Sequence, residues 1–278
     1  MAQIALFNPG EMGSAVGAAL VARGHRVWCA LEGRSEATRH RAARAGLTDA
    51  ATVPAAVSKA TVVLSICPPH AALDVARSVA RAGFKGLFVD GNAISPDTAR
   101  EVAAVVEGGG ARTVDAGIFG SPPSPDKPGK IHFSGTGASE AAGLFEGSCV
   151  HTSVMPGPIG AASALKACYA AWTKGTWLHL ANIYATAQQY GVEEGLREEW
   201  SRSHPELLKQ LAAPSLNPAK AWRWLAEMRE IAATFEAVGM PGGAALAGEA
   251  VCQRLQGCKD DASRPSIEKV AGAVRRSR

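Results

Sequence analysis

The chain has 278 residues, of which 47% are hydrophobic and 19% are charged, and its formal net charge is +4. This length allows one large domain or two ordinary ones, each with a substantial core. The small net charge and the lack of a basic stripe interleaved with aromatic residues argue against nucleic-acid binding. No apolar stretch reaches membrane-spanning length, no signal peptide opens the sequence, and the six cysteines lack metal or redox spacing. We therefore expect a cytoplasmic protein that does not insert into membranes.

Residues 3–130 alternate short apolar runs with Ala-rich helical segments. Continuous apolar strands separated by helices predict a parallel sheet that is covered on both faces. Gly24 and Gly46 are placed as helix C-caps, and the proline-rich segment Ser121–Gly129 is expected to be a surface loop. The expected strands are Ile4–Phe7, Val27–Ala30, Thr61–Ile66, Leu87–Asp90 and Arg112–Asp115.

The pattern changes around Met155–Pro158, after which every signal is helical. Ala161 to Tyr190 forms one long helical stretch without proline, and a second helical segment covers residues 219–238. We expect no strands after about residue 154. The prediction is an α/β fold, in which a Rossmann-type doubly wound parallel sheet at 1–156 is followed by an all-α domain at 157–278.

The first strand leads into a glycine-rich turn, Asn8-Pro9-Gly10-Glu11-Met12-Gly13. It is a variant of G-x-G-x-x-G in which Asn8 replaces the first glycine. Gly10 would let the backbone approach a pyrophosphate, Gly13 would let the helix pack on the strand, and the helix N-terminus would bind the phosphate charge. An ordinary strand–helix turn is the alternative. The complete β-α-β context favours a dinucleotide site.

The end of the second strand bears on the choice of cofactor. Glu32 could bind a ribose 2′-hydroxyl and so favour NAD(H), whereas Arg34 and Ser35 could hold the 2′-phosphate of NADP(H). The positive charge of Arg39 and Arg41 nearby favours NADP(H), with NAD(H) the second choice. The expected cofactor-binding residues are Asn8, Pro9, Gly10, Glu11, Met12, Gly13, Glu32, Arg34, Ser35, Cys67, Pro68 and Asn92.

Four motifs stand in the order found in a known superfamily. They are Gly10-Glu11-Met12-Gly13, Asp90-Gly91-Asn92-Ala93-Ile94-Ser95-Pro96, Asp115-Ala116-Gly117-Ile118-Phe119-Gly120 and Gly160-Ala161-Ala162-Ser163-Ala164-Leu165-Lys166. The chain resembles the β-hydroxyacid dehydrogenase superfamily, which includes 3-hydroxyisobutyrate dehydrogenase, tartronate semialdehyde reductase and 6-phosphogluconate dehydrogenase. Through Lys166–Gly175 and Ala221–Met228 it is most similar to a poorly characterised branch usually labelled phosphogluconate-dehydrogenase-like.

The resemblance places the catalytic lysine of the superfamily on Lys166. Its amine would exchange a proton with the substrate oxygen while hydride moves to or from nicotinamide C4. A lysine does this near neutral pH when burial or nearby positive charge lowers its pKa. The alternative is a surface lysine on an amphipathic helix, which the apolar neighbours Leu165 and Tyr169 disfavour.

Three positions depart from the family pattern. Phe119 stands in place of the usual serine, Ala162 in place of a glycine, and Ala170 in place of an asparagine. The lost polar contacts imply a different substrate headgroup, and Phe119 implies a more apolar pocket. The expected substrate-binding residues are Ile118, Phe119, Gly120, Ser121, Tyr169, Ala170, Thr173 and Glu227.

Glu227 lies on an otherwise apolar helical face with Trp224, Met228 and Ile231. Such a carboxylate could orient Lys166 or a substrate group, or it could form a structural ion pair with an arginine such as Arg223. The sequence leaves both interpretations open. The histidines lack ligand spacing, so no metal is expected, and no G-x-S-x-G pattern supports a hydrolase.

The leading hypothesis is an NAD(P)-dependent oxidoreductase that interconverts a hydroxy acid and its oxo-acid or semialdehyde, a small-molecule substrate. The alternatives are an imine reductase, whose usual Asp or Tyr in place of the lysine argues against it, and a non-catalytic NADP-binding sensor or interaction protein. The helix from Ala161 to Tyr190 would be about 45 Å long at ~1.5 Å per residue, too long for a small domain to cover. We therefore expect a homodimer through the C-terminal helical domain.

Overall fold

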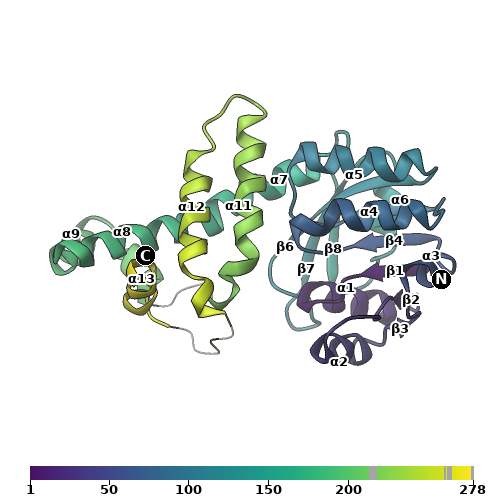
Figure 1. Cartoon of the computed structure of the whole chain (residues 1–278), viewed down its shortest axis with the longest axis horizontal. Coiled ribbons are helices and arrows are strands. Elements are labelled where there is room, and N and C mark those ends of the chain that lie inside the picture. Colours follow the sequence, from purple (N-terminus) through teal and green to yellow (C-terminus); the bar gives the residue numbers. More distant parts are fainter. Residues whose placement is uncertain (213–217, 260, 262–264, 277–278) are drawn as a thin grey trace. The chain divides into compact units, whose positions relative to one another are not determined.

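The computed structural model describes residues 1–212, 218–259, 261 and 265–276, and the chain divides into two units, 1–167 and 168–278 (Figure 1). The first unit contains one eight-stranded sheet in the order β3-β2-β1-β4-β5-β6-β7-β8. Neighbouring strands are parallel except β6 and β7. The strands are β1 Gln3–Phe7, β2 Arg26–Cys29, β3 Thr48–Asp49, β4 Val62–Ser65, β5 Leu87–Asp90, β6 Arg112–Phe119, β7 Gly129–Ser134 and β8 Val150–Val154.

The sheet confirms the Rossmann-type prediction, because its first six strands follow the 3-2-1-4-5-6 order of dinucleotide-binding folds. Each predicted strand is present and starts within one residue of its expected position. The sequence reading missed β3, β7 and β8. β3 has only two residues, and β7 and β8 carry polar residues such as Lys130, His132 and Thr152, which masked their strand pattern.

Helices cover both faces of the sheet. Alternate residues of β1 point into two cores: Ile4 and Leu6 pack with α1, α2 and α6, whereas Ala5 and Phe7 pack with α3, α4 and α5. Figure 1 shows α4 and α5 side by side on one of these faces. The helices are α1 Glu11–Ala22, α2 Glu36–Arg44, α3 Val53–Val57, α4 Ala72–Arg81, α5 Pro96–Gly108 and α6 Ala138–Gly143, with a 3₁₀ turn, η1, at Pro69–Ala71.

The loops of this unit follow the expected chemistry. Gly24 and Gly46 follow α1 and α2 with φ of 82° and 70°, as helix-terminating glycines do. The proline-rich segment runs between the end of β6 at Phe119 and the start of β7 at Gly129 without a strand or helix. It is the surface loop that the sequence predicted.

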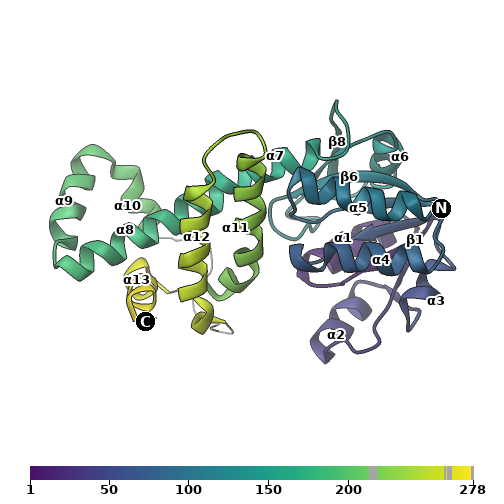
Figure 2. The same ribbon diagram turned by 45° about the horizontal axis from the view of Figure 1, so that its top comes forward.

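The second unit is helical, and the structure describes no strand after Val154 within 155–212, 218–259, 261 and 265–276. Figures 1 and 2 show α11 and α12 side by side as an antiparallel pair that crosses α8. The elements are α8 Thr176–Tyr190, α9 Glu193–Ser203, α10 Pro205–Ala212, η3 Pro218–Lys220, α11 Ala221–Glu236, α12 Gly243–Arg254, η4 Gln256–Cys258 and α13 Ile267–Arg276.

The predicted long helix is interrupted. It consists of α7 (Ala161–Ala170), a π-helical turn η2 (Ala171–Gly175) and α8. Within the turn, the Thr173 hydroxyl donates a hydrogen bond of 3.1 Å to the Tyr169 carbonyl. A threonine bonded in this way competes with the backbone for the same acceptor and distorts helices. Such single π turns are frequent at functional positions.

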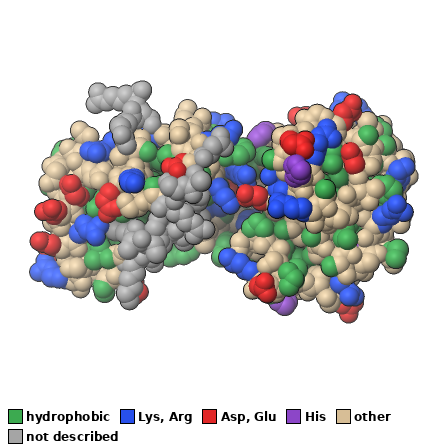
Figure 3. Space-filling model, turned by 90° about the horizontal axis from the view of Figure 1, so that it is seen from below, with side chains coloured by type: hydrophobic (Ala, Val, Ile, Leu, Met, Phe, Trp, Pro, Cys, Tyr) green, Lys and Arg blue, Asp and Glu red, His purple; other side chains and the backbone are tan. Residues whose placement is uncertain are grey.

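The described helices include none with both the length and the apolar character needed to cross a membrane. On the face shown in Figure 3, Lys and Arg side chains are interspersed with Asp and Glu in both units.

Candidate active site

The predicted residues of the first unit lie along one edge of the sheet. In a parallel sheet the carboxyl ends of all strands meet at the same edge, where ligands of such folds bind. Along this edge the order is Arg34 after β2, Asn8 after β1, Cys67 after β4, Asn92 after β5 and Phe119 at the end of β6. At about 4.8 Å per strand, the four intervals from β2 to β6 span about 19 Å. The edge therefore offers one extended row of loops.

The turn after β1 has the geometry that its sequence requires. Asn8 has φ of 61°, a left-handed conformation that asparagine tolerates better than most residues. The Gly10 N–H donates a 2.7 Å hydrogen bond to the Asn8 carbonyl. A Cβ atom on Gly13 would lie 2.7 Å from that same carbonyl oxygen. Gly13 therefore lets α1 start directly behind the turn.

Gly10 has a different explanation. Its φ of −70° suits any residue, and a Cβ there would meet no atom of the chain closer than the Asn8 carbonyl oxygen at 3.9 Å. Packing inside the protein therefore does not require glycine at this position. A side chain would instead fill the space in front of the N-terminus of α1, which is where a bound phosphate group would lie.

The N-terminus of α1 also lacks a side-chain cap, whereas Thr52, Ser35 and Ser95 cap α3, α2 and α5. Uncapped N–H groups at a positive helix end suit an anionic ligand. Together with the open space at Gly10, this turn fits the pyrophosphate of a dinucleotide cofactor. The Oδ1 atom of Asn8 is buried with no hydrogen-bond partner in the described structure.

The residues after β2 lie at the far end of the row. Glu32, Arg34 and Ser35 are all exposed. The Ser35 hydroxyl caps α2 by accepting a hydrogen bond from the Thr38 N–H at 3.4 Å. Arg34 is close enough to Cys67 for its charge to act on that thiol. The Arg34 guanidinium is thus near Cys67, and it follows the strand next to β1, whose turn Asn8–Gly13 is the expected phosphate loop.

Asn92 holds two strand ends together. Its side-chain amide donates to Ser65 Oγ at 3.1 Å and to Asp90 Oδ2 at 3.0 Å, and its Oδ1 accepts from the Cys67 N–H at 2.6 Å. Both amide hydrogens are therefore used inside the protein. Asn92 fixes the Cys67-Pro68 segment, so its effect on a cofactor would pass through that segment.

The pKa values of two ionisable groups beside Asn92, Asp90 and Cys67, are strongly raised. Burial raises the pKa of Asp90 to about 7, and the nearby Asp115 carboxylate adds to the rise, while hydrogen bonds from Asn92 oppose it. Burial, followed by the Asp90 charge, raises the pKa of the Cys67 thiol to about 12. Cys67 therefore stays a thiol near neutral pH and is unsuited to act as a nucleophile.

Asp115 anchors the helix that carries Lys166. Its Oδ2 accepts hydrogen bonds from the Gly160 and Ser163 N–H groups at 2.9 and 3.0 Å, and from the Ser134 hydroxyl at 3.0 Å. Its Oδ1 accepts from the Ser163 hydroxyl at 2.6 Å. The Ser134 hydroxyl in turn accepts from the Ala162 N–H at 3.0 Å. These buried bonds satisfy the N-terminus of α7 and fix its position on the sheet.

Gly117 allows α7 to lie directly against β6. A Cβ at this position would lie 2.9 Å from the Ala162 carbonyl oxygen, 3.1 Å from the Phe119 ring and 3.3 Å from Lys166 Cβ. The close approach brings the Lys166 ammonium over the face of Phe119, 5.0 Å from the ring centroid. Because Phe119 ends β6, the ammonium lies at the last loop of this row, and both side chains are half-buried.

His132 also belongs to this cluster, although it is not among the predicted site residues. Its ring lies edge-on to Phe119, with centroids 5.0 Å apart, because β7 pairs His132 with Gly117. Desolvation, and then the charge of Lys130, lowers its pKa. The only signal for it was the alternation of Lys130, His132 and Ser134, and the antiparallel pairing that places it was not foreseen.

The other expected substrate residues belong to the second unit. Tyr169 is exposed, Ala170 is buried, and Thr173 donates to the Tyr169 carbonyl as described above. Glu227 is buried and forms an ion pair with Lys174, whereas the Arg223 guanidinium lies over the Trp222 ring. Of the two roles considered for Glu227, the structure contains an ion pair, with Lys174 as the partner in place of the suggested arginine.

Within the described parts of the chain, no group of three or more His, Cys, Asp or Glu side chains is arranged to hold a metal ion. The Rossmann-type sheet and the glycine-rich turn after β1 thus define the class of dinucleotide-binding folds, and Lys166 lies over Phe119 at the end of β6.

Comparison with known families gives the same class. Residues 3–142 match the family described as the NAD binding domain of 6-phosphogluconate dehydrogenase, and residues 187–255 match a domain of unknown function, DUF1932. The chain belongs to this NAD-binding family and, through it, to the β-hydroxyacid dehydrogenase superfamily.

Individual relatives extend the comparison. The "Uncharacterized 28.5 kDa protein in 7S RNA 5'region" of Methanothermus fervidus is 28% identical over 168 residues, or 60% of this chain, and the match spans 64% of that curated relative. A solved conserved protein of unknown function, described as structurally similar to 3-hydroxyacid dehydrogenases, is 26% identical with a TM-score of 0.63, over 97% of each chain.

Two further solved structures share the fold. Mycobacterium tuberculosis 3-hydroxyisobutyrate dehydrogenase with L-serine is 19% identical, with a TM-score of 0.69 over 99% of each chain. The imine reductase from Myxococcus stipitatus in complex with NADP+ is 20% identical, with a TM-score of 0.55 over 97% of this chain and 98% of that one.

Proposed function

We propose that the protein is an NAD(P)-dependent oxidoreductase that interconverts a hydroxy acid and its oxo-acid or semialdehyde, with Lys166 as the general acid and base. The observation that carries the proposal is the row of loops along one sheet edge. It begins at Arg34, passes the uncapped turn Asn8–Gly13 and ends at Lys166 over Phe119. This order suits the ribose, the pyrophosphate and the nicotinamide with its substrate in turn.

The bound cofactor would supply or accept the hydride at nicotinamide C4. In the direction of reduction, Lys166 Nζ would give a proton to the carbonyl oxygen as the hydride reaches the carbonyl carbon. In the direction of oxidation, Lys166 would take the proton of the hydroxyl group. Asp115 fixes the start of α7 and would thereby hold Lys166 Nζ within reach of the reacting oxygen.

We favour NADP(H) over NAD(H), because Arg34 follows the strand next to β1 and its expected phosphate loop, and suits a 2′-phosphate. The substrate-binding group would be Ile118, Phe119, Gly120 and Ser121 at the end of β6, with Tyr169, Ala170 and Thr173 from the second unit. Glu227 would act indirectly through Lys174. Phe119 in place of a hydroxyl favours a substrate with an apolar group next to its carbonyl.

The domain roles follow from this assignment. Residues 1–156 would bind the cofactor, and residues 157–278 would bind substrate and form a homodimer. The helices after the boundary bury Trp177 and Leu178 within the unit but leave Trp172 73% exposed, which is consistent with a partner there. Light scattering at micromolar concentration tests the dimer, and a monomer would contradict it.

No disulfide joins the six cysteines, all of which the structure describes, in keeping with a cytoplasmic location.

The deciding experiment adds NADPH and a panel of small oxo-acids, semialdehydes and cyclic imines, and follows the loss of nicotinamide absorbance. Turnover of an oxo-acid or semialdehyde supports the proposal. Turnover of cyclic imines alone would identify an imine reductase instead, and tight NADPH binding without turnover of any of these compounds would identify a sensor.

A further inference from the structure

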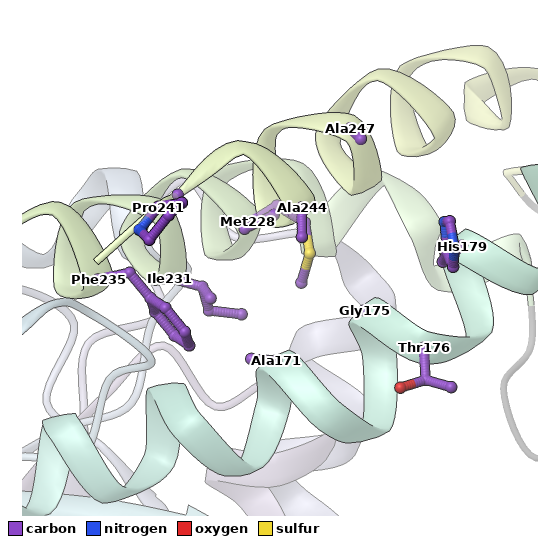
Figure 4. A pocket seen from close by; sticks show the side chains of 12 residues that line it. Ala171, Gly175, Thr176, His179, Met228, Ile231, Phe235, Pro241, Ala244 and Ala247 are labelled. Carbon is purple, nitrogen blue, oxygen red and sulfur yellow. The ribbon is translucent and has the colours of Figure 1, made fainter.

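The helical unit contains a cavity of about 340 Å³, and all its lining residues belong to this unit. In Figure 4, Met228, Ile231 and Phe235 of α11 extend into the space from one side, and Ala171 and Gly175 of the π turn lie opposite them. Pro241, which precedes α12, and Ala244, in the first turn of α12, also line the space. The walls are therefore mostly apolar and come from three separate segments of the chain.

Gly175 is a second observation that points to an occupant. It lies inside the continuous run of α7, η2 and α8, with ordinary helical angles of φ −59° and ψ −46°. A Cβ there would meet no atom within 4 Å. Glycine weakens a helix relative to alanine, and neither backbone strain nor crowding requires it at this position.

Gly248 and Gly243 of the same unit differ from Gly175. A Cβ on Gly248 would lie 3.2 Å from Met228 Sδ and 3.3 Å from Leu178, so internal packing accounts for that glycine. Gly243 is open as well, but it stands at the first position of α12, where helix propensity matters little. Gly175 combines an open position with a mid-helix location on a cavity wall. The missing side chain leaves room for a group from outside the unit.

The cavity has the size and chemistry of a small-molecule site. Apolar cavities of about 150 Å³ bind benzene, and ligand pockets start at about 300 Å³. The buried Met228 thioether adapts to varied shapes and contacts aromatic rings favourably, and Phe235 adds an aromatic wall. His179 and Thr176 supply the polar side chains, and His179 is exposed at one end of the space in Figure 4.

We propose that this cavity binds a small molecule with a single aromatic ring or a branched aliphatic body, whose polar substituent faces His179. Two sources share that chemistry, an apolar part of the enzyme's own substrate and a separate effector. A concave space of this volume, walled by three segments, suits such a molecule better than the flat face of a protein partner.

Calorimetric titration of the intact protein with phenylacetate, and ligand-observed NMR with toluene, test the site. We expect saturable binding of both probes at millimolar concentration. Gly175→Ala should weaken it at least tenfold while leaving the melting temperature unchanged or higher, because alanine favours the helix. Gly195→Ala is the matched control, since Gly195 is also open but lies on α9 outside the cavity.

Two more variants keep the test decisive if Gly175→Ala disturbs the π turn. Ala244→Phe fills the cavity from α12 and should abolish binding of both probes. His179→Ala should weaken the binding of phenylacetate but not of toluene. The proposal is overturned if neither probe binds. It is also overturned if the two filled variants, Gly175→Ala and Ala244→Phe, bind the probes with the affinity of the parent. It is also overturned if the filled variants dissociate an oligomer, because a second copy would then occupy the space.

The two sources separate by competition. If an identified substrate displaces phenylacetate and Gly175→Ala raises its KM, the cavity holds part of the substrate. If phenylacetate binds alongside the substrate, the cavity holds an effector. Probe binding requires no turnover, so failure of the proposed oxidoreductase activity and failure of this site are distinguishable.

Discussion

The N-termini of α1 and α7 differ in whether the protein itself supplies a hydrogen-bond acceptor to them. The N-terminus of α1 has glycine as its N-cap and no side-chain cap, and the space in front of Gly10 is open. The N-terminus of α7 is saturated, because the buried Asp115 carboxylate accepts from the N–H groups of Gly160 and Ser163. The chain leaves one helix end available for an external anion and supplies an internal anion to the other.

The open end of α1 and the closed end of α7 suit different tasks in the proposed site. An open helix end can exchange ligands, because no side chain of the protein caps it. A helix end closed by a buried carboxylate cannot shift without leaving polar groups unpaired, which costs about 1–3 kcal/mol for each group. The first suits cofactor binding and the second suits the fixed placement of Lys166.

The largest effect is expected at the lysine held by the closed end. Lys166→Met keeps an unbranched apolar stem but removes the acid–base group, so turnover of an identified substrate should fall by roughly a hundredfold or more. NADPH affinity should change little, because Lys166 lies at the other end of the row from the phosphate loop. Steady-state kinetics and a fluorescence titration with NADPH measure the two quantities.

Lys174→Met is the control for this variant, since Lys174 is engaged by Glu227 in the second unit. It should cost stability and retain more turnover than Lys166→Met. Near-parental turnover of Lys166→Met, combined with loss of activity in Lys174→Met, would show that the catalytic role has been assigned to the wrong lysine.

A smaller effect is expected when the closed end is loosened. Asp115→Asn turns an acceptor that serves several N–H and O–H donors into a group that presents hydrogens to at least one of them. The free energy of unfolding should fall by about 2–4 kcal/mol, and turnover by about tenfold through misplacement of Lys166.

Ser163→Ala removes only the 2.6 Å hydrogen bond from the Ser163 hydroxyl to Asp115. It should lower the free energy of unfolding and turnover less than Asp115→Asn does. Urea denaturation and kcat on the same preparations test the pair. Equal kcat in the parent and Asp115→Asn would refute a positioning role for this carboxylate.

Cofactor choice sharpens the comparison at the open end. If Arg34 holds a 2′-phosphate, the parent should bind NADPH more tightly than NADH, and Arg34→Ala should reduce that difference by ~1–3 kcal/mol. Arg39→Ala, one turn into α2, is the control and should have a smaller effect. Equal affinities of the parent for NADPH and NADH would contradict this role of Arg34.

A further effect concerns the pH dependence of stability. Asp90 titrates at about 7 when folded, against 3.8 as its ordinary value. Between these values the folded protein retains a proton that the unfolded chain releases, so the free energy of unfolding falls as the pH rises from about 4 to about 7. Asp90→Asn should flatten that part of the curve. A parent curve that rises with pH there, and is unchanged by the substitution, would contradict the shift.

The open end was predictable from sequence, and the closed end was not. Asn8, Gly10 and Gly13 are close in the chain, and their roles follow from local backbone geometry after a strand. The bonds of Asp115 reach residues 45 and 48 positions away, so they depend on how α7 packs on β6. The motif around Asp115 was noticed through family resemblance, but its contacts were not.

The same limit explains what was missed around Lys166 and Glu227. His132 reaches Phe119 only because β7 runs antiparallel to β6, and no short sequence pattern specifies that pairing. Glu227 meets Lys174 across 53 residues. Its apolar helical face predicted burial, but the identity of its partner depended on the π turn that interrupts the long helix.

Gly10→Val tests most directly whether the open end of α1 binds the cofactor. A Cβ atom at this position would lie no closer than 3.9 Å to the chain. We therefore expect the fold to remain, whereas the valine side chain would occupy the phosphate space. Calorimetric titration with NADPH should show binding to the parent and to the control Gly108→Val, whose glycine is equally open at the end of α5. Gly10→Val, with an unchanged melting temperature, should lose at least roughly thirtyfold in affinity, or ~2 kcal/mol. NADPH binding of parental strength by a folded Gly10→Val protein would contradict the account.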